Sequence, residues 1–512
     1  MMKLADLVSK LYITESFIGR MSMEDDVLSI TDDSRRCVNG GMFIAVDGAV
    51  VNGNDYNAMA VKNGAGVIVT SMPLAECRSI LEAQVPEHAG ETTIVCVKDS
   101  RVAVSEIASE FYGNPSSKIK LVGVTGTNGK TSIATILYQL FTKLGYSCGL
   151  LSTIANWVGD KKYPTVNTTP GPVELNCLLN EMCLNGCEYC FMEVSSHALD
   201  QKRTYGLHFT GAIFTNLTHD HLDYHKTFAN YLACKKMLFD SLDSQAWALI
   251  NEDDRNGSVM VQNCKARTMR YSLRGAADFQ TRILEHTLDG MLLRINGKEF
   301  WCRLIGRHNA SNLSAVYGAA ILLGAGEEET ATAISTLKGA EGRLEFHRGG
   351  NNQMAVIDYA HTPDALENVL KALKELPYES DLVCVFGCGG DRDRTKRPEM
   401  AAIAEKYADR IFVTSDNPRT EDPMAIINDI MQGFSLSGKC RCTVLPSRAE
   451  AISAAIRFSN PGSMILIAGK GHEDYQIIGK VKMHFSDREA VLEAFDNPLN
   501  EKTTDIKEDF KK

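Results

Sequence analysis

A glycine-rich stretch followed by a Lys-Thr pair is the strongest chemical feature of the sequence. An apolar run at 119–124 predicts a buried strand, residues 125–131 read TGTNGKT, and apolar side chains at helical spacing predict a helix over 133–144. In this context glycines let backbone N–H groups surround a phosphate, Lys130 neutralises its oxygens, and Thr131 can hold Mg²⁺. The stretch therefore predicts a nucleotide-phosphate site.

The loop departs from the general phosphate-loop pattern at one position. G-x-x-x-x-G-K-[ST] has glycine at position 124, where this chain has Val124. The alternative is a glycine turn that carries an incidental lysine. The strand–loop–helix context, which the motif requires, favours the phosphate loop over that alternative.

Two further clusters place acids and histidines at the ends of predicted strands. Glu193–His197 (EVSSH) follows the apolar run 189–192, and Asn216–His225 (NLTHDHLDYH) follows the run 212–215. Carboxylate and imidazole groups at this edge suit a hard cation that bridges nucleotide phosphates. For the second cluster, helix capping by clustered His and Asp is the competing interpretation.

Two other features have structural alternatives. Lys235 lies in an amphipathic helical pattern, where it is one of two adjacent lysines. Cys183, Cys187 and Cys190, with Tyr189 before the last cysteine, have a spacing similar to the iron–sulfur motif of radical enzymes. Because Cys190 belongs to a predicted buried strand, we favour a structural role for these cysteines.

Composition limits the classes of protein. The 512 residues suit about three domains. An apolar content of 44% with 23% charged residues suits a globular enzyme, and a net charge of −10 argues against a nucleic-acid-coating surface. The N-terminus lacks the pattern of a signal peptide, and no 18-residue apolar run occurs. We therefore expect a cytoplasmic protein without membrane insertion whose 15 cysteines are mostly small buried hydrophobes.

The alternation of strand and helix patterns predicts an α/β protein with three domains. We expect a small α/β domain at 1–100, a central phosphate-loop domain with a parallel sheet at 101–345, a Rossmann-like domain at 346–497, and a charged tail at 498–512. In the third domain, apolar runs at 382–386, 411–414 and 464–468 each end in a polar loop. Ligands of open α/β sheets bind beyond the carboxyl ends of strands, so these loops are expected to meet at one crevice.

Together these stretches resemble the Mur ligase family, the ATP-dependent amide-bond synthetases of peptidoglycan assembly. The resemblance rests on TGTNGKT, EVSSH and NLTHDHLDYH, and on three later motifs in family order: Gly306–Asn312 (GRHNASN), Gly342–Glu345 (GRLE) and Asp358–Pro363 (DYAHTP). The family has a UDP-sugar domain, a central ATPase domain and a C-terminal domain that binds the incoming amino acid.

The resemblance implies roles for individual residues. ATP would be held by Gly126, Thr127, Asn128, Gly129, Lys130, Thr131, Ser132, Asn309, Arg343 and Asp358. The UDP-sugar peptide would be held by Ser34, Asn167, Thr168, Thr169, Ser195, Gln201 and Arg203. Mg²⁺ would be held by Thr131, Glu193, His221 and Lys235, the last matching the family's carbamylated lysine, and the catalytic set would be Lys130, Lys235, His221 and Glu193.

The sequence Asp416–Arg419 (DNPR) resembles the branch of the family that adds meso-2,6-diaminopimelate to UDP-N-acetylmuramoyl-L-alanyl-D-glutamate through an acyl phosphate. The diaminopimelate pocket would comprise Arg392, Asp416, Asn417, Pro418, Arg419, Gly469 and Glu473. The resemblance thus implies a monomeric enzyme with ATP, this nucleotide-sugar peptide and diaminopimelate as partners. A folylpolyglutamate synthetase-like ligase and a non-catalytic nucleotide-binding protein are the alternatives.

Overall fold

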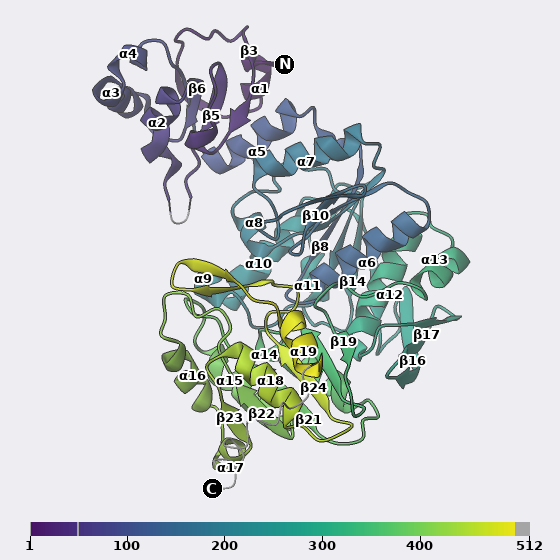
Figure 1. The fold of residues 1–512 in the computed structure, drawn as a ribbon. Helices are drawn as coiled ribbons and strands as arrows, with labels where there is room; N and C mark the ends of the chain where they lie inside the picture. The colour runs from purple at the N-terminus through teal and green to yellow at the C-terminus, as the bar shows by residue number, and fades with distance from the viewer. Residues whose placement is uncertain (1, 49–50, 497–512) are drawn as a thin grey trace.

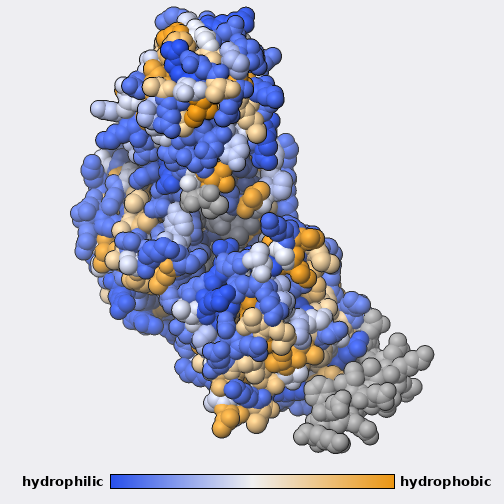
Figure 2. All heavy atoms as spheres, turned by 90° about the vertical axis from the view of Figure 1, so that its left-hand side faces the viewer, coloured by the Kyte–Doolittle hydropathy of each residue, from blue (hydrophilic) through white to orange (hydrophobic). Residues whose placement is uncertain are grey.

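The computed structural model describes residues 2–48 and 51–496, and the chain builds three separate α/β units (Figure 1). We name the N-terminal, central and C-terminal units after the sheets at residues 13–97, 120–302 and 345–468. Figure 2 shows a largely hydrophilic surface that is hollowed between the N-terminal unit and the units below it. The tail expected at 498–512 lies outside the described residues. In the part described, no helix has the length and apolar character needed to cross a bilayer.

The N-terminal unit has a five-stranded sheet with helices on both faces. Its strand order is β2-β7-β6-β5-β4, with only β2 antiparallel to its neighbour. The strands are β2 (Ile13–Phe17), β4 (Ile30–Thr31), β5 (Gly41–Ile44), β6 (Ala65–Thr70) and β7 (Thr93–Val97), and a short pair joins β1 (Met2–Lys3) to β3 (Asp26–Val27). The helices are α1 (Leu4–Val8), α2 (Asn57–Lys62), α3 (Leu74–Gln84), α4 (Pro86–Ala89) and α5 (Ser100–Phe111).

Helix α5 decides where this unit ends. Its side chains Ala103, Val104, Ile107 and Ala108 belong to the same buried cluster as the first helix and strands β5 to β7. Burying an aliphatic side chain stabilises a core by about 1.5–3 kcal/mol, so the N-terminal sheet depends on this helix. We therefore propose that the first domain ends after α5 rather than at residue 100.

The central unit has an eleven-stranded sheet in the order β11-β10-β9-β12-β8-β13-β14-β15-β16-β17-β18. Helices α6, α12 and α13 cover one face and α7 and α10 cover the other. The strands are β8 (Lys120–Thr125), β9 (Cys148–Leu151), β10 (Asn156–Val158), β11 (Lys161–Tyr163), β12 (Tyr189–Glu193), β13 (Gly211–Phe214), β14 (Trp247–Asn251), β15 (Arg267–Ser272), β16 (Phe279–Thr287), β17 (Gly290–Ile295) and β18 (Lys298–Cys302). The helices are α6 (Lys130–Lys143), α7 (Pro172–Leu184), α8 (Ser196–Asp200), α9 (Leu222–His225), α10 (Phe228–Asp240), α11 (Gly257–Met260), α12 (Arg307–Leu322) and α13 (Glu327–Ile334).

The middle of this sheet is parallel, as predicted, but both edges are antiparallel. Strands β10 and β11 form a hairpin at one edge, and β16 to β18 extend the other edge. The turn between β17 and β18 is Asn296-Gly297, with φ values of 47° and 86°. Asn-Gly is a strong hairpin signal because both residues tolerate positive φ. This dipeptide, which the sequence prediction did not use, is a local signal for the antiparallel edge of the sheet.

The C-terminal unit has a six-stranded sheet in the order β19-β20-β24-β21-β22-β23. Helices α14, α15 and α16 pack on one face, and α18 and α19 on the other. The strands are β19 (Glu345–Arg348), β20 (Met354–Asp358), β21 (Leu382–Phe386), β22 (Arg410–Val413), β23 (Cys442–Val444) and β24 (Met464–Ala468), followed by the hairpin β25 (Tyr475–Ile478) and β26 (Val481–His484). The helices are α14 (Pro363–Lys374), α15 (Lys396–Tyr407), α16 (Pro423–Met431), α17 (Leu436–Cys440), α18 (Arg448–Arg457) and α19 (Asp487–Asp496).

The strands predicted before each functional loop are confirmed. The run at 119–124 falls in β8, the run at 189–192 in β12 and the run at 212–215 largely in β13, while β21, β22 and β24 carry the three C-terminal loops. Successive side chains of a strand point to opposite faces of the sheet, and helices cover both faces here, so the central strands are buried on both sides. Val122 and Val124 of β8 face the α6 side, and Leu121 faces the other side.

The proposed end of the first domain can be tested with two fragments. We expect residues 1–113 to unfold cooperatively in urea and residues 1–99 to lack a cooperative transition, because only the longer fragment contains α5. Far-UV circular dichroism during titration measures both. A cooperative transition in the shorter fragment would contradict the proposed boundary.

Candidate active site

The loop between β8 and α6 has the geometry of a phosphate cradle. Gly126 and Gly129 have φ values of 150° and 87°, which favour glycine. A Cβ on Gly126 would lie 1.8 Å from Thr215 Oγ1. Lys130 Nζ donates to the carbonyl oxygens of Gly126 (2.9 Å) and Thr127 (2.7 Å), so its ammonium lies against the loop at the start of α6. Burial lowers the pKa of Lys130.

The end of β13 holds this loop in place. Thr127 N–H donates to the Asn216 carbonyl (2.9 Å), and Asn128 N–H donates to Asn216 Oδ1 (2.9 Å). Thr215 Oγ1 donates to the Asn128 carbonyl (2.6 Å). The polar residues that follow the strand therefore position the loop, and a side chain on Gly126 would disrupt this contact.

A hydroxyl and a carboxylate lie together at the first turn of α6. Thr131 Oγ1 donates to Glu193 Oε2 (2.9 Å), and Thr153 N–H donates to Glu193 Oε1 (2.8 Å). Glu193 is fully buried at the end of β12. Among the described residues, no group of three or more His, Cys, Asp and Glu side chains could hold a metal ion by itself. A hydroxyl beside one carboxylate fits Mg²⁺, which needs few carboxylates when substrate phosphates complete its shell.

Lys235 of α10 reaches the same loop from the side. It is 1% exposed, its Nζ donates to the Gly126 carbonyl (2.7 Å), and the nitrogen lies 4.6 Å from the centre of the Tyr231 ring. Burial, reinforced by the nearby Lys130 charge, puts the pKa of Lys235 well below its usual value. The environment thus favours a neutral amine at this position.

His221 lies on the same side of the loop, at the start of α9. Its Nε2 is 3.3 Å from Asp220 Oδ2, and its ring packs edge-on against His197 at 4.9 Å between centroids. Burial lowers the pKa of His221 to about 3. The imidazole is therefore neutral at pH 7, which is the form that binds metals.

Arg203, Gln201 and Thr169 form one hydrogen-bonded group beside the end of β12. Arg203 donates to Gln201 Oε1 (2.7 Å through Nη2) and to the Thr169 carbonyl (2.8 Å). Thr169 Oγ1 in turn accepts from Ser195 N–H (3.1 Å), and Thr168 Oγ1 accepts from Thr153 Oγ1 (3.1 Å). Hydrogen bonds therefore join four of the predicted sugar-peptide residues into one group. Thr168 lies beside Thr153, which contacts Glu193.

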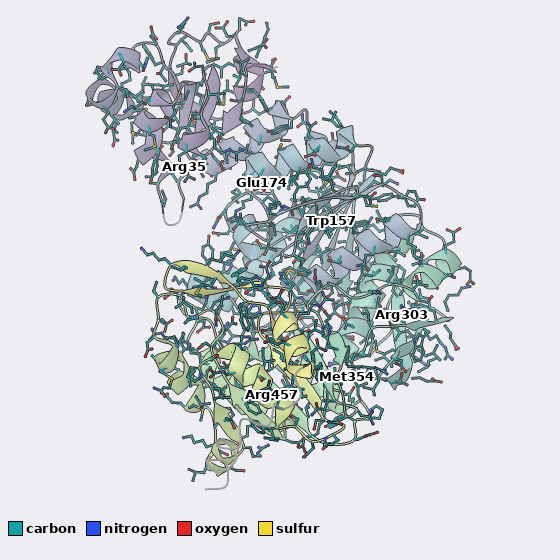
Figure 3. The ribbon with its side chains drawn as sticks, in the orientation of Figure 1. Arg35, Trp157, Glu174, Arg303, Met354 and Arg457 are labelled. Atoms are coloured by element: carbon teal, nitrogen blue, oxygen red, sulfur yellow. The ribbon has the colours of Figure 1, made fainter. Side chains whose placement is uncertain are left out.

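The other two residues of that predicted set lie apart from the group. Asn167 is exposed. Ser34 belongs to the N-terminal unit, where it is buried and its Oγ donates to Met59 Sδ (3.5 Å). Figure 3 labels the adjacent Arg35 on the side of that unit that faces the rest of the molecule, and its guanidinium pairs with Asp33 (2.8 Å). No hydrogen bond among the described residues joins Ser34 to the Arg203 group.

Asn309, Arg343 and Asp358 line one cavity of about 120 Å³ with Ser132 and Gly129. Arg343 Nη2 donates to Thr131 Oγ1 (3.3 Å), and its guanidinium carbon lies 4.6 Å from the centre of the Tyr359 ring. Asp358 accepts the N–H groups of Leu344 and Ala360, both at 2.8 Å. A second cavity of about 340 Å³ shares Asn216, His308, Ser311 and Asn368 with the first. The predicted nucleoside residues therefore converge beside the phosphate loop.

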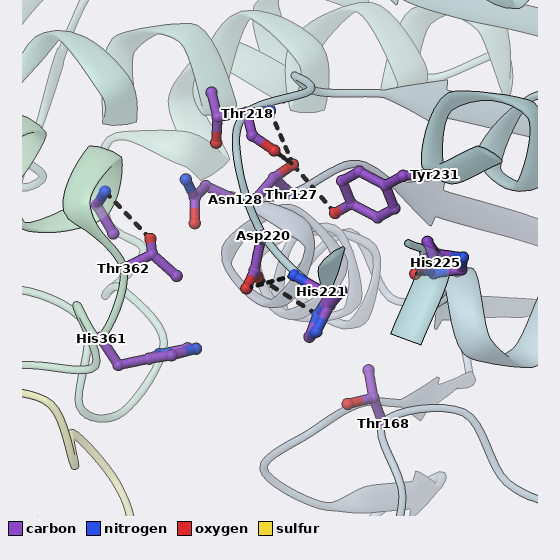
Figure 4. Close-up of polar contacts among 12 residues, drawn as sticks. Thr127, Asn128, Thr168, Thr218, Asp220, His221, His225, Tyr231, His361 and Thr362 are labelled. Atoms are coloured by element: carbon purple, nitrogen blue, oxygen red, sulfur yellow. Dashed lines mark hydrogen bonds and ion pairs between the residues drawn. The ribbon is translucent and has the colours of Figure 1, made fainter. Parts of the chain in front are cut away.

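The central and C-terminal units meet at this loop. Asn128 Nδ2 donates to Asp364 Oδ2 (2.7 Å) in the first turn of α14. Figure 4 shows His361 extending from the C-terminal unit toward Asp220 and His221. His361 Nδ1 donates to the Tyr359 carbonyl (2.8 Å), and burial lowers the pKa of His361 to about 4. A neutral ring with Nε2 as an acceptor is therefore available at the interface.

The sequence prediction gave Asp364, His361 and Tyr359 no role. The motif DYAHTP contained two of them, yet only Asp358 was assigned to the site. Nothing in a single sequence indicates that this loop faces TGTNGKT from another sheet.

The three C-terminal loops meet, as predicted. Arg419 Nη1 donates to the Gly390 carbonyl (2.8 Å), and Asn417 Nδ2 donates to Glu473 Oε2 (3.0 Å). Lys470, which the sequence prediction did not assign, is fully buried and donates to Glu473 Oε2 (3.0 Å). Asp416 Oδ1 is buried and has no hydrogen-bond partner. The Lys470 ammonium lies 3.8 Å from this oxygen, so the Asp416 charge is paired within the fold.

The three other members of the predicted set, Arg392, Pro418 and Gly469, lie in these same loops. Pro418 and Gly469 follow β22 and β24, and a Cβ on Gly469 would lie 3.1 Å from Asp416 Oδ2. A Cβ on Gly389 would lie 2.9 Å from Arg419 Nη1 and 3.7 Å from Arg392 Cγ, so the two arginines share one neighbourhood.

The three closely spaced cysteines are packed into the fold. Cys190 lies in β12 and is fully buried, Cys187 is buried before that strand, and Cys183 ends α7 and points to the Pro115 carbonyl (3.5 Å). Burial raises the pKa of the Cys190 thiol. Thiols in this state are poor metal ligands, which supports the structural role.

Comparisons with known proteins agree with this geometry. Residues 124–320 match the Mur ligase middle domain, and residues 342–471 match the Mur ligase glutamate ligase domain. The chain is 46% identical to the UDP-N-acetylmuramoyl-L-alanyl-D-glutamate–2,6-diaminopimelate ligase of Cytophaga hutchinsonii. The match covers 97% of this chain and 99% of that relative. The chain belongs to the Mur ligase family. The enzyme of the same name from Phocaeicola vulgatus is 47% identical over 97% of this chain and all of its own.

Solved structures of family members share this fold. A structure of UDP-N-acetylmuramoyl-L-alanyl-D-glutamate–2,6-diaminopimelate ligase matches with a TM-score of 0.66 at 31% identity, over 97% of this chain and 99% of that one. The MurF ligase of Thermotoga maritima, solved in complex with ADP, matches with a TM-score of 0.61 at 18% identity. The match covers 91% of this chain and 96% of that one. The second likeness concerns the fold alone.

The phosphate cradle predicts an effect of Gly126→Ala. We expect at least a tenfold loss of ATP affinity, about 1.4 kcal/mol or more, because the added Cβ would overlap Thr215 Oγ1. Isothermal titration calorimetry measures the affinity. Gly145→Ala is the matched control, since Gly145 also has positive φ (96°) but no atom within 4 Å of the added Cβ. Equal affinities for the Gly126 variant and the wild type would refute the cradle.

Proposed function

We propose that the protein uses ATP to join meso-2,6-diaminopimelate to UDP-N-acetylmuramoyl-L-alanyl-D-glutamate, a step of peptidoglycan precursor synthesis. The observation that carries the proposal is the convergence of β21, β22 and β24 loops around Arg419 in a unit whose α14 contacts the phosphate loop. The named relatives, 46% and 47% identical over nearly the whole chain, support the same reaction.

The chemistry requires activation of a carboxylate. Hydroxide or oxide is a poor leaving group, so a carboxylate and an amine do not form an amide in water. Transfer of the γ-phosphoryl group makes an acyl phosphate, which the amine attacks with release of phosphate. Phosphoryl transfer depends mainly on positioning and charge neutralisation. Lys130 and the N-terminus of α6 supply both at the phosphate loop.

Several side chains of this chain would hold Mg²⁺ and the nucleotide. Thr131 and Glu193, with His221 and a carbamylated Lys235, would hold Mg²⁺, which when bound neutralises phosphate charge. Asn309, Arg343 and Asp358 would contact the nucleoside and phosphates, because they line the cavity beside the loop. The sugar peptide would be held by Ser34, Asn167, Thr168, Thr169, Ser195, Gln201 and Arg203. Its anionic groups suit the positive charge of the Arg203 guanidinium.

A neutral Lys235 amine can attack CO₂, forming an N–C bond and releasing a proton, to become an anionic carbamate. An ammonium beside Mg²⁺ would repel the metal, whereas a carbamate attracts it. The low pKa that burial gives Lys235 supports this modification. The one chain supplies all of these groups, which supports a monomer. Its net charge of −10 argues against a nucleic-acid partner.

Arg419 would select the amino acid. Diaminopimelate differs from lysine by a distal carboxylate, which a guanidinium can bind bidentately with about 1.5–3 kcal/mol. Glu473, Asp416 and Asn417 would hold the amino-acid end, with Arg392 nearby. A folylpolyglutamate synthetase-like ligase has no corresponding support, because the solved folylpolyglutamate synthases match at 16–19% identity and share the fold alone.

The proposed reaction and the role of Arg419 are tested by one assay. We expect ATP-dependent phosphate release that requires both UDP-N-acetylmuramoyl-dipeptide and diaminopimelate. Arg419→Ala is expected to lower kcat/KM for diaminopimelate by about tenfold or more while the Kd for ATP stays within twofold. Equal losses for the amino acid and for ATP would contradict this role, and phosphate release without diaminopimelate would contradict the reaction.

The carbamate predicts chemical rescue of Lys235→Ala. We expect an inactive variant whose activity returns in part when a short carboxylate such as formate or acetate is added, because the carboxylate can occupy the place of the carbamate. Lys236→Ala, on the same helix and half-buried, is the matched control and should keep its activity. A fully active Lys235→Ala would rule out the carbamate.

A further inference from the structure

A fully buried arginine, paired with two partly exposed carboxylates, lies just outside the proposed amino-acid pocket. Arg397, in the first turn of α15, is 0% exposed. Its Nη1 donates to Glu421 Oε2 (3.1 Å) and Asp429 Oδ2 (2.8 Å), and its Nη2 donates to Glu421 Oε1 (2.9 Å). Arg397 cannot touch a ligand, so the proposed reaction leaves this pair without a role.

The pair ties two of the site's loops together. Arg397 Nη2 also donates to the Gly389 carbonyl (3.3 Å), and Glu421 Oε1 accepts Asp391 N–H (2.6 Å). Gly390 N–H donates to the Asn417 carbonyl (2.9 Å). The backbone at 389–391 is therefore fixed to the loop that contains Arg419. Removing the carboxylate would leave the fully buried Arg397 charge without its bidentate partner, so the link is costly to break.

The Arg419 side chain rests on that backbone. Its Nη1 donates to the Gly390 carbonyl (2.8 Å), and a Cβ on Gly389 would lie 2.9 Å from the same nitrogen. A Cβ on Gly390 would lie 1.9 Å from the Pro418 carbonyl oxygen. The guanidinium therefore lies directly against residues 389 and 390, which give it its direction.

We propose that Arg397 and Glu421 are positioning residues that set the selectivity of the site for an amino acid with a distal carboxylate. The inference rests on the proposed function and adds to it. A bidentate contact needs placement within about 0.5 Å and 10–20°. When the 389–391 backbone shifts, an amino acid that binds Arg419 loses affinity, while one without a distal carboxylate loses little.

The test is Glu421→Gln, which keeps the size and an acceptor oxygen but removes the charge. We expect the KM for diaminopimelate to rise about tenfold, the KM for ATP to stay within twofold, and the ratio of kcat/KM for diaminopimelate to that for lysine to fall about tenfold. Arg397→Lys should shift the same ratio in the same direction, because an ammonium cannot form the bidentate pair.

Arg394→Gln is the matched control within the same cluster. Arg394 Nη2 lies 2.8 Å from Glu421 Oε2, but its side chain is 67% exposed, so its loss should leave both KM values and the ratio within twofold. Thermal unfolding of each variant measures the folded fraction. Partial misfolding lowers turnover of both amino acids equally and leaves their ratio unchanged.

The measurements distinguish failure of the positioning role from failure of the proposed function. A folded Glu421→Gln with an unchanged ratio and an unchanged diaminopimelate KM would overturn the proposal, as would equal rises in the KM values for ATP and diaminopimelate. Failure of the wild type to use diaminopimelate would instead overturn the proposed function. A fallen ratio with an unchanged ATP KM would establish the positioning role.

Discussion

The close approach of the phosphate loop to the end of β13 is the contact on which the site depends. Gly126 allows the loop to lie against Thr215, and Asn216 then holds the loop backbone at two points. The Gly126 carbonyl consequently faces a space that Lys130 and Lys235 both reach, at 2.9 and 2.7 Å. The Lys130 ammonium gives this space the positive charge that a triphosphate needs, whereas burial favours the neutral amine of Lys235.

Burial then decides the charge of the groups around the loop. His221 and His361 lie where the pKa of an imidazole falls to about 3 and about 4, and Lys235 lies where an amine loses its proton readily. Neutral imidazole and neutral amine can act as ligand, acceptor or nucleophile toward CO₂, which their charged forms cannot. The low-dielectric setting therefore supplies reactivity that the residue types alone do not guarantee.

The three units divide the work in space. The central sheet ends at the phosphate loop, the Arg203 group lies beside β12 on the side of the N-terminal unit, and the C-terminal sheet presents Arg419 and its neighbours. Contacts such as Asn128 to Asp364 join the loop to the C-terminal unit. Under the proposed function, the carboxylate and the amine would come from different units and meet beside the γ-phosphoryl group.

The sequence by itself predicted the local elements, which the structure confirms, and the residues that are proposed for the site. TGTNGKT between a β-branched run and a helical pattern identified the phosphate loop, and polar loops after 382–386, 411–414 and 464–468 identified the C-terminal crevice, because strand ends and glycine turns are local properties of the chain. Only the tertiary structure decided what faces what. Asp364 contacts the phosphate loop from another unit, and Figure 4 shows His361 extending toward Asp220 and His221. Lys470 donates to Asn417 in a different loop, and Arg397 pairs with Glu421 across two loops. The depth of burial that sets the pKa of Lys235 was likewise invisible in its helix pattern, because two adjacent lysines look alike until one of them is packed inward.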